Sequence, residues 1–136
     1  MDDQTLRHIL QENRTIAVVG LSDKPHRASY DVAKYLVGHG YKIIPVNPNL
    51  KEVLKQKCYP SLREIPEKID LVDCFRRSEA ILPIAEDAIA IGAKVLWMQM
   101  GMVNQTAADK ATAAGLQVIM NRCIKIEHLR LAHMTR

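Results

Sequence analysis

The stretch TIAVVGLSDKPHRAS, residues 15–29, decides the fold of this chain. Residues 15–19 form a short, continuous apolar run, which is typical of a strand that is buried on both faces of a parallel sheet. Gly20 follows directly and permits a tight turn. We expect a helix to follow, with Ser29 as its N-cap, residues 30–37 as its body and Gly38 as its stop. The stretch therefore predicts a strand–turn–helix unit.

Strand and helix patterns alternate along the rest of the chain. The other predicted strands are residues 41–47, 58–60, 71–75, 95–98 and 116–120, with 58–60 as a very short edge strand. Pro45 cannot donate to a ladder, so we expect a bulge or an unpaired donor position there. The other predicted helices are residues 2–12, 84–91 after Pro83, 107–114 capped by Asn104, and 126–132.

This alternation, with glycine at helix exits, is typical of right-handed crossovers and a parallel sheet. We therefore predict an α/β fold: a doubly wound, Rossmann-like parallel sheet of five to six strands in the order 3-2-1-4-5-6, with helices on both faces. We expect residues 1–136 to form a single domain. In such sheets a ligand binds beyond the carboxyl ends of the strands, where the order reverses beside strand one.

Composition narrows the class of protein. The chain has 136 residues, of which 48% are hydrophobic and 25% charged, as in ordinary globular domains. No apolar run approaches the roughly 18–20 residues that span a bilayer, and the acidic start is unlike a secretory signal, so we expect a cytoplasmic protein with no membrane partner. Three cysteines without a C-x-x-C pair indicate reduced thiols. The five histidines show no metal spacing.

The loop that begins at Gly20 has the character of a phosphate site. A helix N-terminus offers free N–H groups and a positive dipole end to a phosphate. The loop lacks the later glycines of G-x-G-x-x-G, because Ser22 stands in place of the second, and no G-K-[ST] follows. Lys24 and Arg27 make the loop cationic. The overall charge of +4 is scattered, which favours an anionic small ligand over nucleic acid.

The end of the second strand narrows the choice of ligand. NAD-binding domains usually place a carboxylate there, to bind the ribose hydroxyls. Here that strand ends at Asn47 and Pro48. A ligand with an extra phosphate on its ribose would prefer cations to a carboxylate. NADP and coenzyme A (CoA) both satisfy this condition.

Six stretches in this order resemble a known family, the single-domain CoA-binding proteins, which are similar to the CoA-binding domain of the succinyl-CoA synthetase α-subunit. The stretches are VVGLS with Lys24, Pro25 and Arg27; IPVNP (44–48); KCYPS (57–61); DCFRR (73–77); KVLWMQMG (94–101); and NRCIKIEH (121–128). The resemblance covers residues 14–130. It implies a Rossmann-like fold that binds CoA.

The resemblance also implies where the ligand lies. Gly20, Ser22 and Lys24 would lie at the phosphates, with Leu21 in the same turn. Arg27, Asn47 and Pro48 would lie near the adenosine end. Phe75 and Arg76 would follow the pyrophosphate or pantetheine, and Gln99 and Gly101 would line the pocket. Cys123 follows the last strand and could face the ligand's thiol, although a small buried residue is the commoner role of a free cysteine.

The synthetase works through a phosphorylated histidine in a second domain, and this sequence ends at Arg136, so we do not expect ligase chemistry. No catalytic set of side chains is evident. We therefore predict a non-catalytic carrier, sensor or regulatory module that binds CoA or an acyl-CoA. The alternative is an NADP-dependent oxidoreductase-type enzyme on the same fold. The sequence does not indicate a protein partner.

Overall fold

The computed structural model describes residues 1–132, so residues 133–136 of the expected domain lie outside the described part. Its centre is a parallel sheet of five strands in the order β2-β1-β5-β6-β7. The strands are β1 (Thr15–Val19), β2 (Lys42–Val46), β5 (Leu71–Cys74), β6 (Val95–Met98) and β7 (Gln117–Ile119). The Rossmann-like α/β prediction is confirmed.

The predicted strand order is confirmed for these five strands but not for the sixth. Residues 58–60 form no strand, and only an isolated parallel bridge joins Tyr59 to Val46. A short antiparallel hairpin, β3 (Glu52–Val53) and β4 (Gln56–Lys57), occupies the chain before this bridge. The carbonyl of Pro45 accepts from the Tyr59 amide (3.0 Å) at this outer edge of the sheet. The edge position explains how β2 accommodates a proline.

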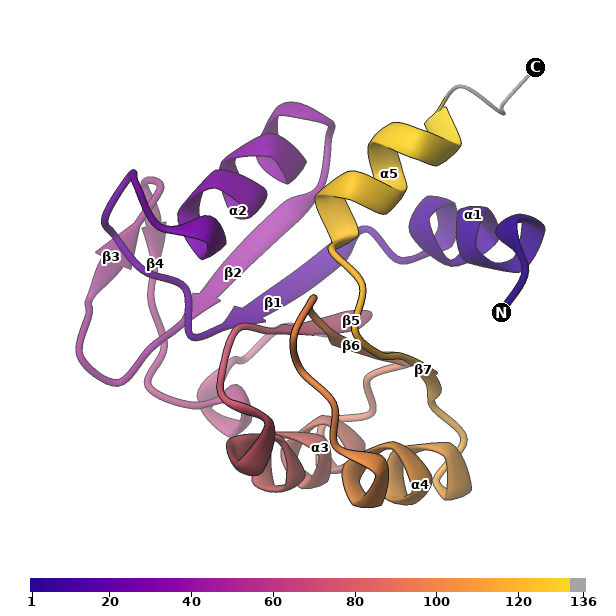
Figure 1. Cartoon of the computed structure of the whole chain (residues 1–136). Helices are drawn as coiled ribbons and strands as arrows, with labels where there is room; N and C mark the ends of the chain where they lie inside the picture. The colour runs from indigo at the N-terminus through magenta and orange to yellow at the C-terminus, as the bar shows by residue number, and fades with distance from the viewer. Residues whose placement is uncertain (133–136) are drawn as a thin grey trace.

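Within residues 1–132, five α-helices cover the sheet (Figure 1). One face carries α1 (Asp3–Glu12), α2 (Ala28–Gly38) and α5 (Ile124–Ala132), and the other carries α3 (Ile81–Ala90) and α4 (Gln105–Ala113). Each layer of helices encloses its own apolar core with the sheet, and Trp97 is fully buried in the core under α1, α2 and α5. No helix within residues 1–132 is long and apolar enough to cross a membrane.

The predicted cap of α4 is confirmed, whereas the predicted starts of α2, α3 and α5 differ from the structure by two or three residues. Asn104 caps α4, because its Oδ1 accepts from the Ala107 amide at 2.9 Å. Ser29 is not the N-cap of α2; Arg27 is the N-cap, and the helix begins at Ala28, two residues before its predicted start. Helix α3 begins at residue 81 after a 3₁₀ turn (Ser78–Ala80), so Pro83 lies third in its first turn, where no amide donor is required. Helix α5 begins two residues before its predicted start.

Candidate functional site

The turn after β1 depends on Gly20. Its φ is +87°, a left-handed conformation that favours glycine, and its amide donates to the Val46 carbonyl (2.8 Å). A Cβ at this position would collide with the carbonyl oxygen of Phe75 and approach Cδ of Arg76 at 2.9 Å. The close approach draws the loops after β1, β2 and β5 together at the carboxyl edge of the sheet.

Two serines fix the path of the loop beyond Gly20. The Ser22 amide donates to Oγ of Ser29 (3.0 Å), and the Ser22 hydroxyl accepts from the Lys24 amide (3.0 Å). Ser29 is buried, so its hydroxyl is used inside the loop and not as a helix cap. Asn47 joins the loop to the end of β2, because its Nδ2 donates to the Leu21 carbonyl at 3.1 Å. The Leu21 side chain itself is buried in the core.

The N-terminus of α2 points its free donors at this loop. Arg27 occupies the N-cap position and makes no side-chain capping hydrogen bond. By contrast, the side chains of Asp2 and Asn104 cap α1 and α4. The first turn of an uncapped helix presents unpaired N–H groups and a positive dipole end. Such an arrangement can bind a phosphate or carboxylate.

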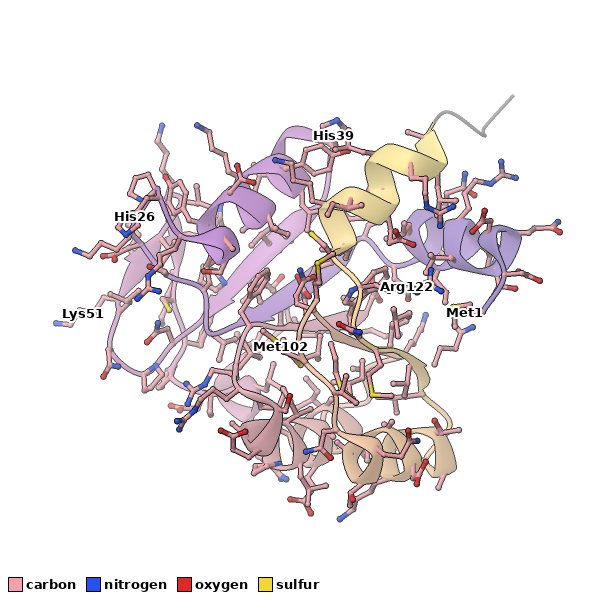
Figure 2. All side chains as sticks on the ribbon, in the orientation of Figure 1. Met1, His26, His39, Lys51, Met102 and Arg122 are labelled. Carbon is pink, nitrogen blue, oxygen red and sulfur yellow. The ribbon has the colours of Figure 1, made fainter. Side chains whose placement is uncertain are left out.

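A cavity of about 520 Å³ lies at this helix end. It carries two cationic side chains, Lys24 and Arg27, and one carboxylate, Asp23. Of the predicted site residues, Gly20, Ser22, Lys24, Arg27, Asn47 and Phe75 line it. The cavity also includes Ala28, Ser29, Asn49 and Leu50, which the sequence did not indicate as site residues. Figure 2 shows His26 and Lys51 projecting from the same end of the molecule.

A second cavity, which we call the apolar groove, adjoins the first at Gly20 and measures about 340 Å³. Its walls come from the ends of β1 and β2, the segment after Tyr59 and the start of α3. The predicted residues Pro48 and Arg76 line it, together with Val19, Val46, Pro60, Ser61, Leu62, Ala80, Pro83, Ile84 and Asp87. A flat heteroaromatic ring or a hydrocarbon segment suits such walls, because burial of apolar surface favours binding.

Gln99 and Gly101 lie at the same edge of the sheet but line neither cavity. Gln99 is only 3% exposed, and its Oε1 accepts from the Ile124 amide (3.1 Å), which ties β6 to the start of α5. The Gly101 amide donates to Oδ1 of Asn121 at 2.7 Å. A contact between a ligand and either residue stays a prediction.

The ionisable groups near the centre of the sheet are buried. Asp73 of β5 is fully buried, and neither of its carboxyl oxygens has a hydrogen-bond partner among the described residues. Burial therefore raises the pKa of Asp73 well above its usual value. Burial likewise raises the pKa of the Cys74 thiol, and the Asp73 charge adds to the effect. Within residues 1–132, no group of three or more metal-ligating side chains lies together.

Cys123 lies directly before α5, half-buried, and packs against the core under α2 and α5. It lines neither cavity, so its reaction with a ligand's thiol stays a prediction. Cys58 and Cys74 are buried.

The fold and the site define a Rossmann-like α/β domain with two adjoining cavities at the carboxyl edge of its sheet. A family model described as a CoA binding domain matches residues 14–129, so this chain belongs to that family. The uncharacterized protein YneT of Bacillus subtilis (strain 168) is 46% identical over 123 residues, covering 90% of this chain and 91% of that protein. The predicted resemblance to CoA-binding domains is confirmed.

Solved structures and ligases extend this relationship. A hypothetical protein from Pyrococcus horikoshii OT3 has a TM-score of 0.95 and 46% identity, covering 97% of this chain and 93% of that chain. Acetate–CoA ligase (ADP-forming) II subunit alpha of Pyrococcus furiosus is 44% identical over 59 residues. That match covers 43% of this chain but only 13% of the ligase subunit. This chain thus corresponds to a small part of the ligase.

Proposed function

We propose that this protein binds CoA or an acyl-CoA at the two cavities and leaves it chemically unchanged, as a carrier, sensor or regulatory module. The observation that carries the proposal is the uncapped N-terminus of α2, flanked by Lys24 and Arg27 in a cavity of about 520 Å³. Membership of the CoA-binding domain family supports CoA as the ligand. The names of the ligase relatives support the same choice.

The two cavities suit different parts of the ligand. The diphosphate would lie at Gly20, Ser22 and the start of α2, where backbone N–H groups and Lys24 favour negative charge. The apolar groove would take the adenine ring between Pro48 and the start of α3, since its walls are mostly proline and aliphatic. Arg27 would then pair with the ribose phosphate. Pantetheine would leave past Phe75.

We propose that the protein leaves its ligand chemically unchanged because of the residues that line the two cavities. Among the described residues that form the two cavities there is no histidine or cysteine to act as nucleophile or base. The buried Cys58 and Cys74 have raised pKa values because burial disfavours the thiolate. The ligase relatives are much longer than the matched region, so their reaction is not assigned to this chain.

Calorimetric titration with CoA, 3′-dephospho-CoA, NADP and NAD tests the proposal. We expect CoA to bind and NAD to bind weakly or not at all. Loss of the 3′-phosphate should weaken binding about tenfold or more, because a hydrogen bond to a charged group contributes roughly 1.5–3 kcal/mol. Tight binding of NADP together with no binding of CoA would contradict the proposal. Recovery of intact CoA after incubation would support the absence of chemistry.

A further inference from the structure

The loop between β6 and α4 presents apolar side chains to solvent at the same edge of the sheet as the cavities. Met100 is 59% exposed and Val103 is 50% exposed, and both belong to the small set of exposed large apolar residues in the described chain. Met102 lies between them and is half-buried against the core under α3 and α4. Solvent-facing loops are usually polar, so two exposed large apolar side chains within one short loop make it a candidate binding surface.

Hydrogen bonds from both sides fix this loop. The Gly101 amide donates to Oδ1 of Asn121 (2.7 Å), and the Met102 amide donates to the Gln99 carbonyl (2.9 Å). The Val103 amide donates to Oγ of Ser78 at 3.0 Å. The apolar side chains are therefore displayed on an ordered backbone, which reduces the entropic cost of binding.

The loop is close to the proposed CoA site. Strands β1, β5 and β6 are adjacent in the sheet, so the end of β6 lies about 10 Å from the end of β1 at two strand spacings. Ser78, which holds Val103, lies between Arg76 and Ala80, and both of those residues line the apolar groove. In Figure 2, Met102 lies between the end that carries His26 and the side that carries Arg122. An extended pantetheine arm starting at Gly20 is long enough to reach this loop.

We propose that Met100 and Val103 bind the hydrocarbon chain of an acyl-CoA, so that this protein prefers acyl-CoA over free CoA. The inference rests on the proposed function, because the diphosphate at Gly20 sets the direction of the arm. Free CoA ends in a small thiol that would leave both side chains exposed. An acyl chain of a few carbons would cover them, and methionine adapts well to flexible chains.

Titration of the wild-type protein with CoA and with acetyl-, butanoyl- and hexanoyl-CoA tests the proposal. Each methylene that is fully buried should tighten binding by about fourfold, so partial burial of the chain predicts at least a tenfold preference for hexanoyl-CoA over acetyl-CoA. The double variant Met100→Gln with Val103→Thr should reduce the ratio of hexanoyl-CoA affinity to free CoA affinity toward one. The circular dichroism spectrum would establish that the variant is folded.

Ile126→Gln is the matched control. Ile126 is 49% exposed and lies on α5, where it lines neither cavity, so its replacement should leave the chain-length series unchanged. If the wild type binds CoA but its affinity is independent of chain length, this proposal is wrong while the proposed function stands. An unaltered series in the double variant would also overturn it. If neither CoA nor any acyl-CoA binds, the proposed function itself fails.

Discussion

The β1–α2 and β6–α4 connections have the same architecture and opposite chemistry. Each contains a left-handed glycine, Gly20 at φ +87° directly after β1 and Gly101 at φ +89° as the third residue after β6, and each leads into a helix at the carboxyl edge of the sheet. The first carries Lys24 and Arg27 and leaves its helix uncapped. The second carries exposed apolar side chains, and its helix is closed by Asn104.

From this difference we expect that the fold supplies similar positions at the two connections and that the side chains decide which one suits an anion. A helix N-terminus attracts negative charge only while its first amides are free. Asn104 satisfies one of these amides in α4, and no cation lies between Gln99 and Asn104. In α2 the corresponding cap position belongs to Arg27, whose guanidinium adds positive charge instead of closing the helix.

Replacing the left-handed glycine of each connection with alanine should give the largest difference in stability between the two connections. The Cβ that Gly101→Ala adds would have no other atom within 4 Å. The variant should therefore lose only the free energy needed to hold alanine in a left-handed conformation, about 1–2 kcal/mol. Gly20→Ala adds a collision with the Phe75 carbonyl, so its cost should reach about 3 kcal/mol or more. Urea unfolding measures both. Equal losses would show that the close approach at Gly20 is not what requires glycine.

The same contrast separates what the sequence could predict from what it could not. The strands were predicted within one or two residues, because strands buried on both faces read as continuous apolar runs. The β3–β4 hairpin was missed because its turn residues, Leu54 (φ 53°) and Lys55 (φ 62°), are left-handed without the usual glycine or asparagine. Residues 58–60 look like a strand but reach only one bridge to β2.

The candidate site, too, was only partly predictable from the sequence. The loop after β1 was predicted in position and charge, because both depend on residues adjacent in sequence. Ser29 looks like a helix cap, yet its hydroxyl accepts from the Ser22 amide seven residues earlier. Gln99 follows a strand as a ligand-binding residue would, but it bonds to Ile124. The apolar groove combines four separate segments, which no local pattern reveals.

Arg27→Ala should have the next largest effect, on ligand binding. We expect CoA affinity to fall by about 1.5–3 kcal/mol, or roughly 10–150-fold, as for loss of a hydrogen bond between charged groups. Lys34→Ala is the matched control, because Lys34 is an exposed cation on the same helix and lies outside both cavities. Calorimetry compares the two variants. An unchanged affinity for Arg27→Ala would remove Arg27 from the site.

Asp73 lies on the strand between the two connections, paired in register with Val18 on one side and Trp97 on the other. Its pKa is raised in the folded protein by burial, so the folded state keeps a proton that the unfolded state has lost once the pH exceeds about 4. The protonated Asp73 therefore contributes to the free energy of unfolding at low pH. This contribution is lost as the pH rises through the pKa of Asp73 in the folded protein, by up to about 1.4 kcal/mol per pH unit.

Asp73→Asn removes this titration while keeping the size of the side chain. The wild type should lose stability relative to the variant as the pH rises from about 4, and urea unfolding at a series of pH values measures the difference. Parallel pH profiles for the two proteins would show that Asp73 does not titrate differently in the folded and unfolded states.

The smallest effect should come from opening the capped helix. Asn104→Ala removes the hydrogen bond from the Ala107 amide and the one that Nδ2 donates to the Ser78 carbonyl, and loss of the cap should cost about 1 kcal/mol in urea unfolding. The variant should bind CoA with unchanged affinity. Freeing the N-terminus of α4 supplies unpaired amides, but the adjoining loop carries no cation and its exposed side chains are apolar. A new anion site in this variant would mean that an open helix end alone is sufficient. In that case Lys24 and Arg27 would not be what distinguishes the β1–α2 connection.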